Sequence, residues 1–280
     1  MYITRIDHMN LEQIANSGQC FRWKKLNNNT YGIPAFNRYL EISQDGDMFT
    51  LSCDENEWNN TWKNYFDIDT NYNEAERIVM EFDDKFLKAA YQFGSGIRIL
   101  RQDLWEVIVS FIISQNNNIP RIKKSIEKLC NADENNGMFP NFVEVGLMEL
   151  SGIGLGYRDE YLKDAAFWWA DRAGCIEREL RTSENPRKIL KEVKGVGNKV
   201  ADCICLFGLH CLDAFPIDTH IKNIIDREYN GEIPEWINSE YAGLFQQYIF
   251  YYELNHRPVL QTATEFVGYA DQSGLMPATS

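Results

Sequence analysis

The sequence has no long uninterrupted apolar run, and no stretch approaches the length that crosses a bilayer. Its first residues carry no basic segment followed by an apolar one, so we expect no secretory signal and an intracellular protein. The seven cysteines are scattered, without close pairs at zinc spacing or the even number of a disulfide framework. We therefore expect reduced thiols in a reducing compartment and no metal site.

Basic residues are also few: 28 Lys and Arg stand against 41 Asp and Glu, giving a net charge of −13. This balance disfavours a general nucleic-acid binder, because such proteins neutralise phosphates with clustered cations. The acidic residues are unevenly placed, however. Residues 45–92 hold 12 acidic and 4 basic residues, whereas 95–130 hold 3 and 6, and 185–227 hold 5 and 7. A nucleic-acid surface would lie in the two later segments, with binding that is weak or strongly dependent on salt.

The 280 residues are 44% hydrophobic, which suffices for one large or two modest cores. No linker, low-complexity tract or fixed-period repeat is visible. Alternating apolar and polar residues predict strands at 31–33, 38–43 and 48–53, with a hairpin turn at 45–47. From about Asn73 the spacing becomes helical. We expect an α+β protein in which a small antiparallel sheet domain (1–90) packs on a larger, all-helical domain (91–280).

One run carries chemistry. Gly195 and Gly197 bracket a turn, Lys199 follows just inside the predicted helix, and Asp218 opens the next helix. A glycine-bracketed turn at a helix start offers backbone N–H groups to a phosphate, while lysine and aspartate supply a nucleophile and a charge partner. Each residue also has a simpler interpretation. Lys199 could lie at the solvated edge of a buried stripe, and Asp218 after Pro216 is a good helix N-cap.

Six segments, in this order along the chain, resemble the 8-oxoguanine DNA glycosylase/AP lyases of the helix-hairpin-helix (HhH-GPD) superfamily. They are 18–23, 98–103, 111–122, 155–158, 194–203 with 216–220, and 241–243. The resemblance runs from about residue 15 to about residue 255. It implies a sheet domain packed on a helix-hairpin-helix glycosylase domain, acting on double-stranded DNA that contains 8-oxoguanine.

By this resemblance the protein is a bifunctional enzyme. Lys199 would attack C1′ of the damaged nucleotide to form a Schiff base, after which β-elimination cuts the strand on the 3′ side. Asp218 would stabilise the sugar cation that forms as the glycosidic bond breaks. We expect a monomer that is cytoplasmic and nucleoid-associated in a bacterium, or nuclear in a eukaryote.

The resemblance also implies a pocket for the flipped base. Gly18 would offer its carbonyl to the N7–H that 8-oxoguanine has and guanine lacks. Cys203 and Phe250 would form the two faces of the pocket, and Gln246 would read the Watson–Crick edge. Two alternatives stay open here, since Gln247 is a possible reader one position on and the aromatic residues of 244–252 could simply be core.

Four further residues resemble those that replace the flipped base and inspect its partner: Asn116, Tyr157, Arg121 and Arg158. Arginine only donates hydrogen bonds, so the two arginines favour cytosine, whose exposed N3 and O2 accept. The positions that would contact DNA phosphates are Gly195, Gly197, Val200 and His220.

No cofactor is required by this interpretation, although the 194–199 hairpin could hold a monovalent cation, as in the family. The four-cysteine iron–sulfur loop of some related glycosylases is absent, because no cysteine follows Cys211. Two other functions compete with this one. The first is a glycosylase for another damaged base, and the second is a non-catalytic DNA-damage-binding module, for which the hairpin alone would suffice.

Overall fold

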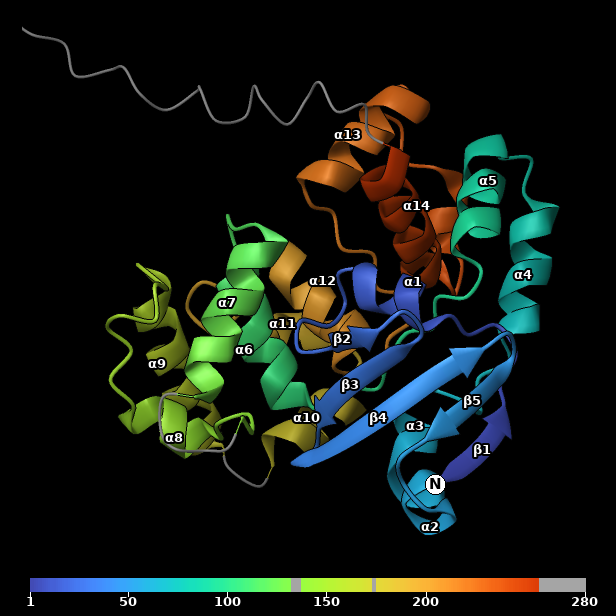
Figure 1. Ribbon diagram of the computed structural model, residues 1–280. Helices are drawn as coiled ribbons and strands as arrows, with labels where there is room; N and C mark the ends of the chain where they lie inside the picture. The colour runs from blue at the N-terminus through green and yellow to red at the C-terminus, as the bar shows by residue number, and fades with distance from the viewer. Residues whose placement is uncertain (132–136, 173–174, 257–280) are drawn as a thin grey trace, which may run out of the picture.

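The computed structural model describes residues 1–131, 137–172 and 175–256 of the chain. An antiparallel sheet formed between Tyr2 and Leu51 packs beside a body of helices formed by most of the later described residues (Figure 1). This is the α+β class that the sequence predicts, and it is confirmed. None of the described helices is long and apolar enough to cross a membrane.

The sheet has five antiparallel strands in the order β1-β5-β4-β3-β2. The strands are β1 (Tyr2–Arg5), β2 (Lys24–Asn27), β3 (Thr30–Ala35), β4 (Arg38–Asp45) and β5 (Met48–Leu51). Ile42 of β4 is buried and pairs with Leu51 of β5, as the alternating pattern predicts. The strands β3, β4 and β5 were expected, whereas β1 and β2 were not. All four residues of β2 are exposed, so no buried alternation marks it in the sequence.

Short helices close the inner face of the sheet. They are α1 (Leu11–Asn16), α2 (Glu55–Glu57), the π-helical turn η1 (Trp58–Trp62) and α3 (Lys63–Tyr65). Trp62 and Phe66 are fully buried there, together with Ile33, Leu40 and Leu51 of the sheet. Burial of large aromatic side chains against a sheet supplies most of the stability of such a small layer.

The helical body begins at residue 72, close to the expected change of period at about Asn73. Its helices are α4 (Tyr72–Glu81), α5 (Lys85–Gly94), α6 (Leu104–Ser114), α7 (Ile119–Cys130), α8 (Phe142–Leu147), α9 (Arg158–Asp171), α10 (Ile176–Thr182), α11 (Pro186–Leu190), α12 (Asn198–Phe207), α13 (Thr219–Glu228), the 3₁₀ turn η2 (Glu235–Asn238) and α14 (Ala242–His256). Helix α6 is buried on all sides and packs against α7, α9 and α12, while α14 packs against α5.

The apolar interior divides into two clusters. One cluster lies under the sheet and takes its residues from the first 66 positions, plus Leu100. The other fills the helical body and includes Tyr72, Ala75 and Val79 of α4. The predicted domain boundary at residue 90 stays a prediction, but α4 and α5 share their core with the later helices.

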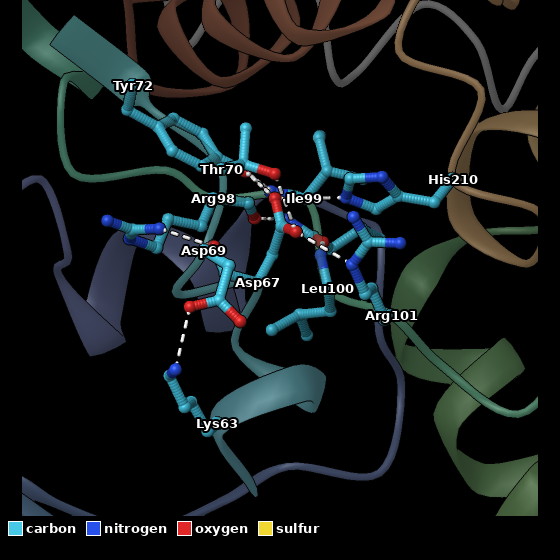
Figure 2. A network of polar contacts seen from close by, with 11 residues as sticks. Lys63, Asp67, Asp69, Thr70, Tyr72, Arg98, Ile99, Leu100, Arg101 and His210 are labelled. Atoms are coloured by element: carbon cyan, nitrogen blue, oxygen red, sulfur yellow. Dashed lines mark hydrogen bonds and ion pairs between the residues drawn. The ribbon is translucent and has the colours of Figure 1, made fainter.

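A buried network of polar contacts joins the sheet layer to the helical body (Figure 2). Asp67, which is 1% exposed, accepts hydrogen bonds from the hydroxyls of Thr70 (2.8 Å) and Tyr72 (3.0 Å). It also pairs with Arg101 Nε at 2.7 Å and with His210 Nε2 at 3.0 Å. Burial raises the pKa of Asp67, but the neighbouring His210 and Arg101 outweigh burial and lower it.

Arg98 extends the same network from the opposite side (Figure 2). Its guanidinium donates to the carbonyls of Asp67 (2.7 Å) and Asp7 (2.9 Å) and lies over the ring of Tyr72. Segments around residues 7, 67, 98 and 210 are therefore fixed to one another at this point. We call the group formed by Asp67, Tyr72, Arg98, Arg101 and His210 the junction network.

A second buried ion pair crosses the same boundary elsewhere. Arg22, in the loop before β2, contacts Glu106 of α6 at 2.8 Å, and both side chains are largely buried. Burial raises the pKa of Glu106 to about 7, and the attraction of Arg22 only partly opposes it. The guanidinium also donates to the carbonyl of Gly137 at 2.6 Å.

Candidate active site and nucleic-acid interface

The glycine-bracketed turn between α11 and α12 has the predicted form. Gly195 has φ of +85°, a region that residues with a Cβ rarely adopt, and an added Cβ would lie 2.3 Å from the ring of Tyr161. Gly197 is the N-cap of α12, and no side chain caps this helix start. The first N–H groups of α12, including that of Val200, are therefore available to an anion such as a DNA phosphate.

Lys199 lies in the first turn of α12 and is half-buried. Its Nζ lies over the ring of Phe111 in α6, 5.3 Å from the ring centre, and its charge is close enough to the thiol of Cys203 to lower the pKa of that group. The opposite side of the helix packs into the core, because Val200, Ile204 and Phe207 are buried as their spacing predicts. The sequence predicts Lys199 at the edge of a buried stripe, and the structure has it there, with its amine over the ring of Phe111.

Asp218 caps α13. Its Oδ1 accepts the N–H of Ile221 at 2.9 Å, so the expected N-cap is confirmed. The side chain is half-buried and lies close enough to Cys203 for its charge to raise the pKa of that thiol. A carboxylate held at a helix N-terminus is fixed in direction, which suits it to stabilise a nearby cation.

Both residues line one open cleft of about 1100 Å³. Predicted site residues from five separate parts of the chain meet in its walls: Gly18, Asn116, Gly197, Lys199, Val200, Asp218, His220 and Phe250. Phe21, Phe111 and Leu254 add apolar surface, and Lys222 adds a second amine. The fold therefore brings together the anion-binding turn, the amine, the carboxylate and a partly aromatic wall.

Gly18 and Phe250 lie in contact at one end of the cleft. Gly18 has φ of +79°, and a Cβ at this position would stand 3.0 Å from Cε1 of Phe250. Gln19 holds the loop that carries Gly18 in place. Its side-chain NH₂ donates to the carbonyl of Arg98, and its side-chain oxygen accepts the N–H of Leu100. A planar base that enters between Gly18 and Phe250 must move the Phe250 ring aside.

Two predicted pocket residues lie behind the cleft wall instead of in it. Cys203 is 3% exposed, and burial raises its pKa to about 11, while Lys199 partly opposes that rise. Gln246 is 4% exposed and donates to the carbonyl of Pro216 at 3.3 Å. Gln247, the alternative reader, is also buried and donates to Gln246 Oε1 at 2.9 Å. The expectation that 244–252 could be core holds for most of this segment.

Two of the predicted wedge residues, Asn116 and Tyr157, are in contact with each other. Asn116 Nδ2 donates to the hydroxyl of Tyr157 at 3.1 Å, and both side chains are exposed. Asn116 has φ of +46°, which asparagine tolerates better than most residues. Asn118 then caps α7 by accepting the N–H of Arg121. The asparagine run therefore provides an exposed residue with positive φ, Asn116, and the N-cap of α7, Asn118.

The two predicted arginines have different surroundings. Arg121 is exposed, and its guanidinium makes a long hydrogen bond of 3.4 Å to the carbonyl of Gly154. Arg158 is 4% exposed, and its guanidinium donates to the carbonyls of Gln115, Asn116 and Leu155. Arg158 therefore braces the loop that carries Asn116, and the predicted contact of both arginines with the estranged base stays a prediction.

His220 lies in the first turn of α13, edge-on to Phe250 with ring centres 5.6 Å apart. Its Nδ1 is buried without a hydrogen-bond partner among the described residues. The same described part of the chain has no cluster of three His, Cys, Asp or Glu side chains that could hold a metal ion.

Sequence reasoning did not assign a role to Phe111 or Phe21. Phe111 stacks on Phe207 of α12 and lies under Lys199, and Phe21 packs edge-on against Phe111. Both occur in the motifs quoted above, but an aromatic residue in an apolar run is usually core. Phe21 also borders a second cavity of about 480 Å³ between the sheet and α7, which contains neither Lys199 nor Asp218.

A helix-hairpin-helix with a lysine and a capping aspartate in one cleft defines the class of helix-hairpin-helix DNA glycosylases. Comparison with known proteins agrees. The sequence model of the 8-oxoguanine DNA glycosylase N-terminal domain matches residues 1–108. The N-glycosylase/DNA lyase of Saccharomyces cerevisiae is 31% identical over 78% of this chain and 68% of its own length.

Solved structures are similar over almost the whole chain. The Clostridium acetobutylicum 8-oxoguanine glycosylase/lyase, bound to double-stranded DNA with cytosine opposite 8-oxoguanine, is 31% identical with a TM-score of 0.80, covering 91% of this chain and 98% of that one. MBOgg1 in complex with a low-affinity DNA ligand is 34% identical with a TM-score of 0.81, at coverages of 90% and 95%. The chain belongs to the 8-oxoguanine DNA glycosylase/AP lyase family of the helix-hairpin-helix superfamily.

Proposed function

We propose that this protein excises 8-oxoguanine from double-stranded DNA and cleaves the strand through a Schiff base on Lys199. The observation that carries the proposal is the meeting of Lys199 and Asp218 in one cleft beside an uncapped helix N-terminus. Phosphate binding alone would need neither the amine nor the carboxylate, so this arrangement favours the enzyme over a module that only binds damaged DNA.

The chemistry follows from the roles of the two side chains. As the glycosidic bond breaks, the base leaves with the bonding electrons, and the carboxylate of Asp218 stabilises the positive charge left on the sugar. The neutral amine of Lys199 attacks C1′, and opening of the sugar ring gives an imine. The imine accepts electrons when C2′ loses a proton, and the 3′-phosphate is then expelled.

Binding of the DNA backbone is proposed at the N–H groups of α12, with Gly195 and Gly197 shaping the turn and His220 reaching a phosphate from α13. Arg121 would favour cytosine opposite the lesion, and Arg158 would hold the loop that carries Asn116. The carbonyl groups of the 194–199 hairpin are the candidate ligands for a monovalent cation. We propose a monomer that acts where the DNA is, in the nucleoid of a bacterium or in the nucleus of a eukaryote.

Borohydride trapping tests the nucleophile. The protein is incubated with an 8-oxoguanine:cytosine duplex and borohydride, and the products are separated by denaturing electrophoresis. Wild type should give a covalent protein–DNA adduct, and Lys199→Gln should give none while still binding the lesion duplex.

Lys222→Gln is the matched control, because Lys222 lines the same cleft. This variant should retain the adduct. An undiminished adduct with Lys199→Gln would place the nucleophile elsewhere, and loss of the adduct in both variants would point to charge in the cleft instead of covalent chemistry. A glycosylase for a different lesion would leave 8-oxoguanine intact and cut another member of a panel of lesion duplexes.

A further inference from the structure

The second cavity, of about 480 Å³, lies between the sheet and α7, and its walls come mainly from 21–24, β3, β4, α7 and 137–139. Small-molecule sites usually enclose about 300–1,000 Å³ and are mostly apolar, with a few charged groups that fix the ligand. A strand of nucleic acid needs instead a groove that follows its backbone. The cavity therefore has the size of a site for one small molecule.

Aromatic side chains form part of these walls. Tyr39 of β4 is 56% exposed, and Met138, which borders the same cavity, is 42% exposed. Gly32 leaves room for Tyr39, because a Cβ at Gly32 would lie 2.2 Å from the Tyr39 hydroxyl oxygen. Phe139 adds a second, half-buried ring from another part of the chain. A planar ring bound here would cover aromatic and apolar surface that now faces solvent.

The charge of the cavity lining is opposite to that of the whole chain. Four basic side chains and one acidic side chain stand among the described lining residues, whereas the chain carries a net charge of −13. The charged residues are Arg22, Lys24, Arg38, Lys123 and Glu127. A cavity lined by positive charge attracts an anion.

Lys123 is the basic residue whose amine is available to a ligand. Lys24 is paired with Glu127 at 2.7 Å. Arg22 and Arg38 also have acidic partners. Lys123 is half-buried, and its amine makes no hydrogen bond or ion pair within the part of the chain that the structure describes. An anion in the cavity would therefore give this amine its partner.

We infer that the second cavity binds a mononucleotide, whose base stacks on Tyr39 and whose phosphate pairs with Lys123. A phosphate monoester carries a charge of about −1.5 to −2 near neutral pH, and the base supplies the planar ring. Both requirements of the lining are thus met by one small molecule. The inference is independent of the proposed function, because neither Lys199 nor Asp218 lines this cavity.

Calorimetric titration with dAMP, deoxyadenosine and inorganic phosphate tests the two contacts separately. Wild type should bind dAMP at least about tenfold more tightly than either of the other two, because each of them makes only one of the contacts. Lys123→Gln should weaken dAMP binding about tenfold and leave the affinity for deoxyadenosine unchanged. Tyr39→Ser should weaken the binding of both by roughly tenfold.

Lys124→Gln is the matched control, because Lys124 follows Lys123 on α7 but does not line the cavity. It should keep the wild-type affinity for dAMP, and thermal unfolding shows whether each variant is folded. Wild type that binds no dAMP at millimolar concentration overturns the inference. Equal losses of affinity in the two glutamine variants would mean that dAMP responds only to the general charge of α7, which also overturns it.

Competition with DNA separates the second cavity from the catalytic cleft. A duplex that contains 8-oxoguanine is added to Lys199→Gln with dAMP bound, since this variant should hold the duplex without cutting it. The nucleotide should stay bound, because the duplex occupies the cleft. Displacement of dAMP by the duplex, with the loss of affinity absent in Lys123→Gln, would place the nucleotide in the catalytic cleft and overturn the inference.

Discussion

The cleft and the junction network differ in how their charged side chains are paired. In the junction network, four side chains contact the carboxylate of Asp67. Two of them, Arg101 and His210, come from different segments of the chain. In the cleft, no ion pair joins Lys199 or Asp218 to another residue of the described chain. Lys199 lies over the ring of Phe111, and Asp218 accepts one backbone N–H.

The difference separates what holds the protein together from what it does. A buried charge that is fully paired stabilises one arrangement of the chain, and removing its partner leaves a costly unpaired group. An ionisable group that has few partners in a cleft is available to interact with a ligand, but it contributes less to the stability of the fold. The junction network also holds the loop after α12 through His210. It therefore helps to position the cleft, although its own residues do not line the cleft.

Replacing one aspartate by asparagine in each region should lower stability in one case and the excision rate in the other. Asp67→Asn removes the charge that pairs with Arg101 and His210, and we expect the free energy of unfolding to fall by roughly 3 kcal/mol with little change in the excision rate of the folded protein. Asp218→Asn keeps the helix cap but loses the charge, so stability should hold while single-turnover excision slows about 100-fold or more.

Urea unfolding and single-turnover excision of 8-oxoguanine measure the two quantities on both variants. An Asp218→Asn variant that excises at the wild-type rate would show that Asp218 is only a cap. Equal losses of stability in the two variants would remove the contrast between the regions.

The sequence predicted the cleft better than the junction. The turn at Gly195, the helix start at Lys199 and the cap at Asp218 follow from local rules, because glycine conformation and capping depend on residues a few positions apart. The junction network joins side chains near 7, 67, 98 and 210, and nothing local to Asp67 indicates that it is buried.

Inside the site, sequence reasoning was weakest where burial decides the role. The motif placed Gln246 and Cys203 in the pocket, but how far each lies behind the wall depends on how α14 and α12 pack. Arg121 and Arg158 looked equivalent in the sequence, and only the folded loop at 115–116 separates an exposed guanidinium from a bracing one. Strands β1 and β2 were missed for a related reason, because neither contains a fully buried residue: β2 is exposed throughout, and β1 alternates only between half-buried and exposed residues.

The two buried carboxylates at the boundary should respond oppositely to pH. The pKa of Glu106 is raised to about 7, so the folded state binds more protons than the unfolded state between about pH 4.5 and 7, and stability falls as pH rises through this range. The pKa of Asp67 is lowered, so its contribution is present above its ordinary value near 4 and is lost only in more acidic solution.

Glu106→Gln isolates this effect. Between pH 5 and 8 the stability of wild type should decline relative to that of the variant by on the order of 2 kcal/mol, because other titrating groups cancel in the difference. The measurement is the free energy of unfolding of both proteins at several pH values. A difference that is constant with pH would mean that Arg22 keeps Glu106 ionised throughout.

The smallest expected effect concerns the base opposite the lesion, where one arginine lies at the surface and the other is already engaged. Arg121 is exposed and has a long hydrogen bond, so its donors are available to cytosine N3 and O2. Arg121→Ala should narrow the ratio of excision opposite cytosine to excision opposite adenine by about tenfold or less, because a contact made by an exposed arginine should fall at the low end of the range of about 1–3 kcal/mol. Arg158 braces the carbonyls of Gln115 and Asn116, so Arg158→Ala should slow excision opposite all four bases and leave that ratio nearly unchanged. Single-turnover excision opposite each base, with Arg121→Lys as the charge-preserving control, distinguishes the two roles. If Arg158→Ala alone removed the cytosine preference, Arg158 would have to leave its carbonyl partners when DNA binds, and the division between the reading and the bracing arginine would be wrong.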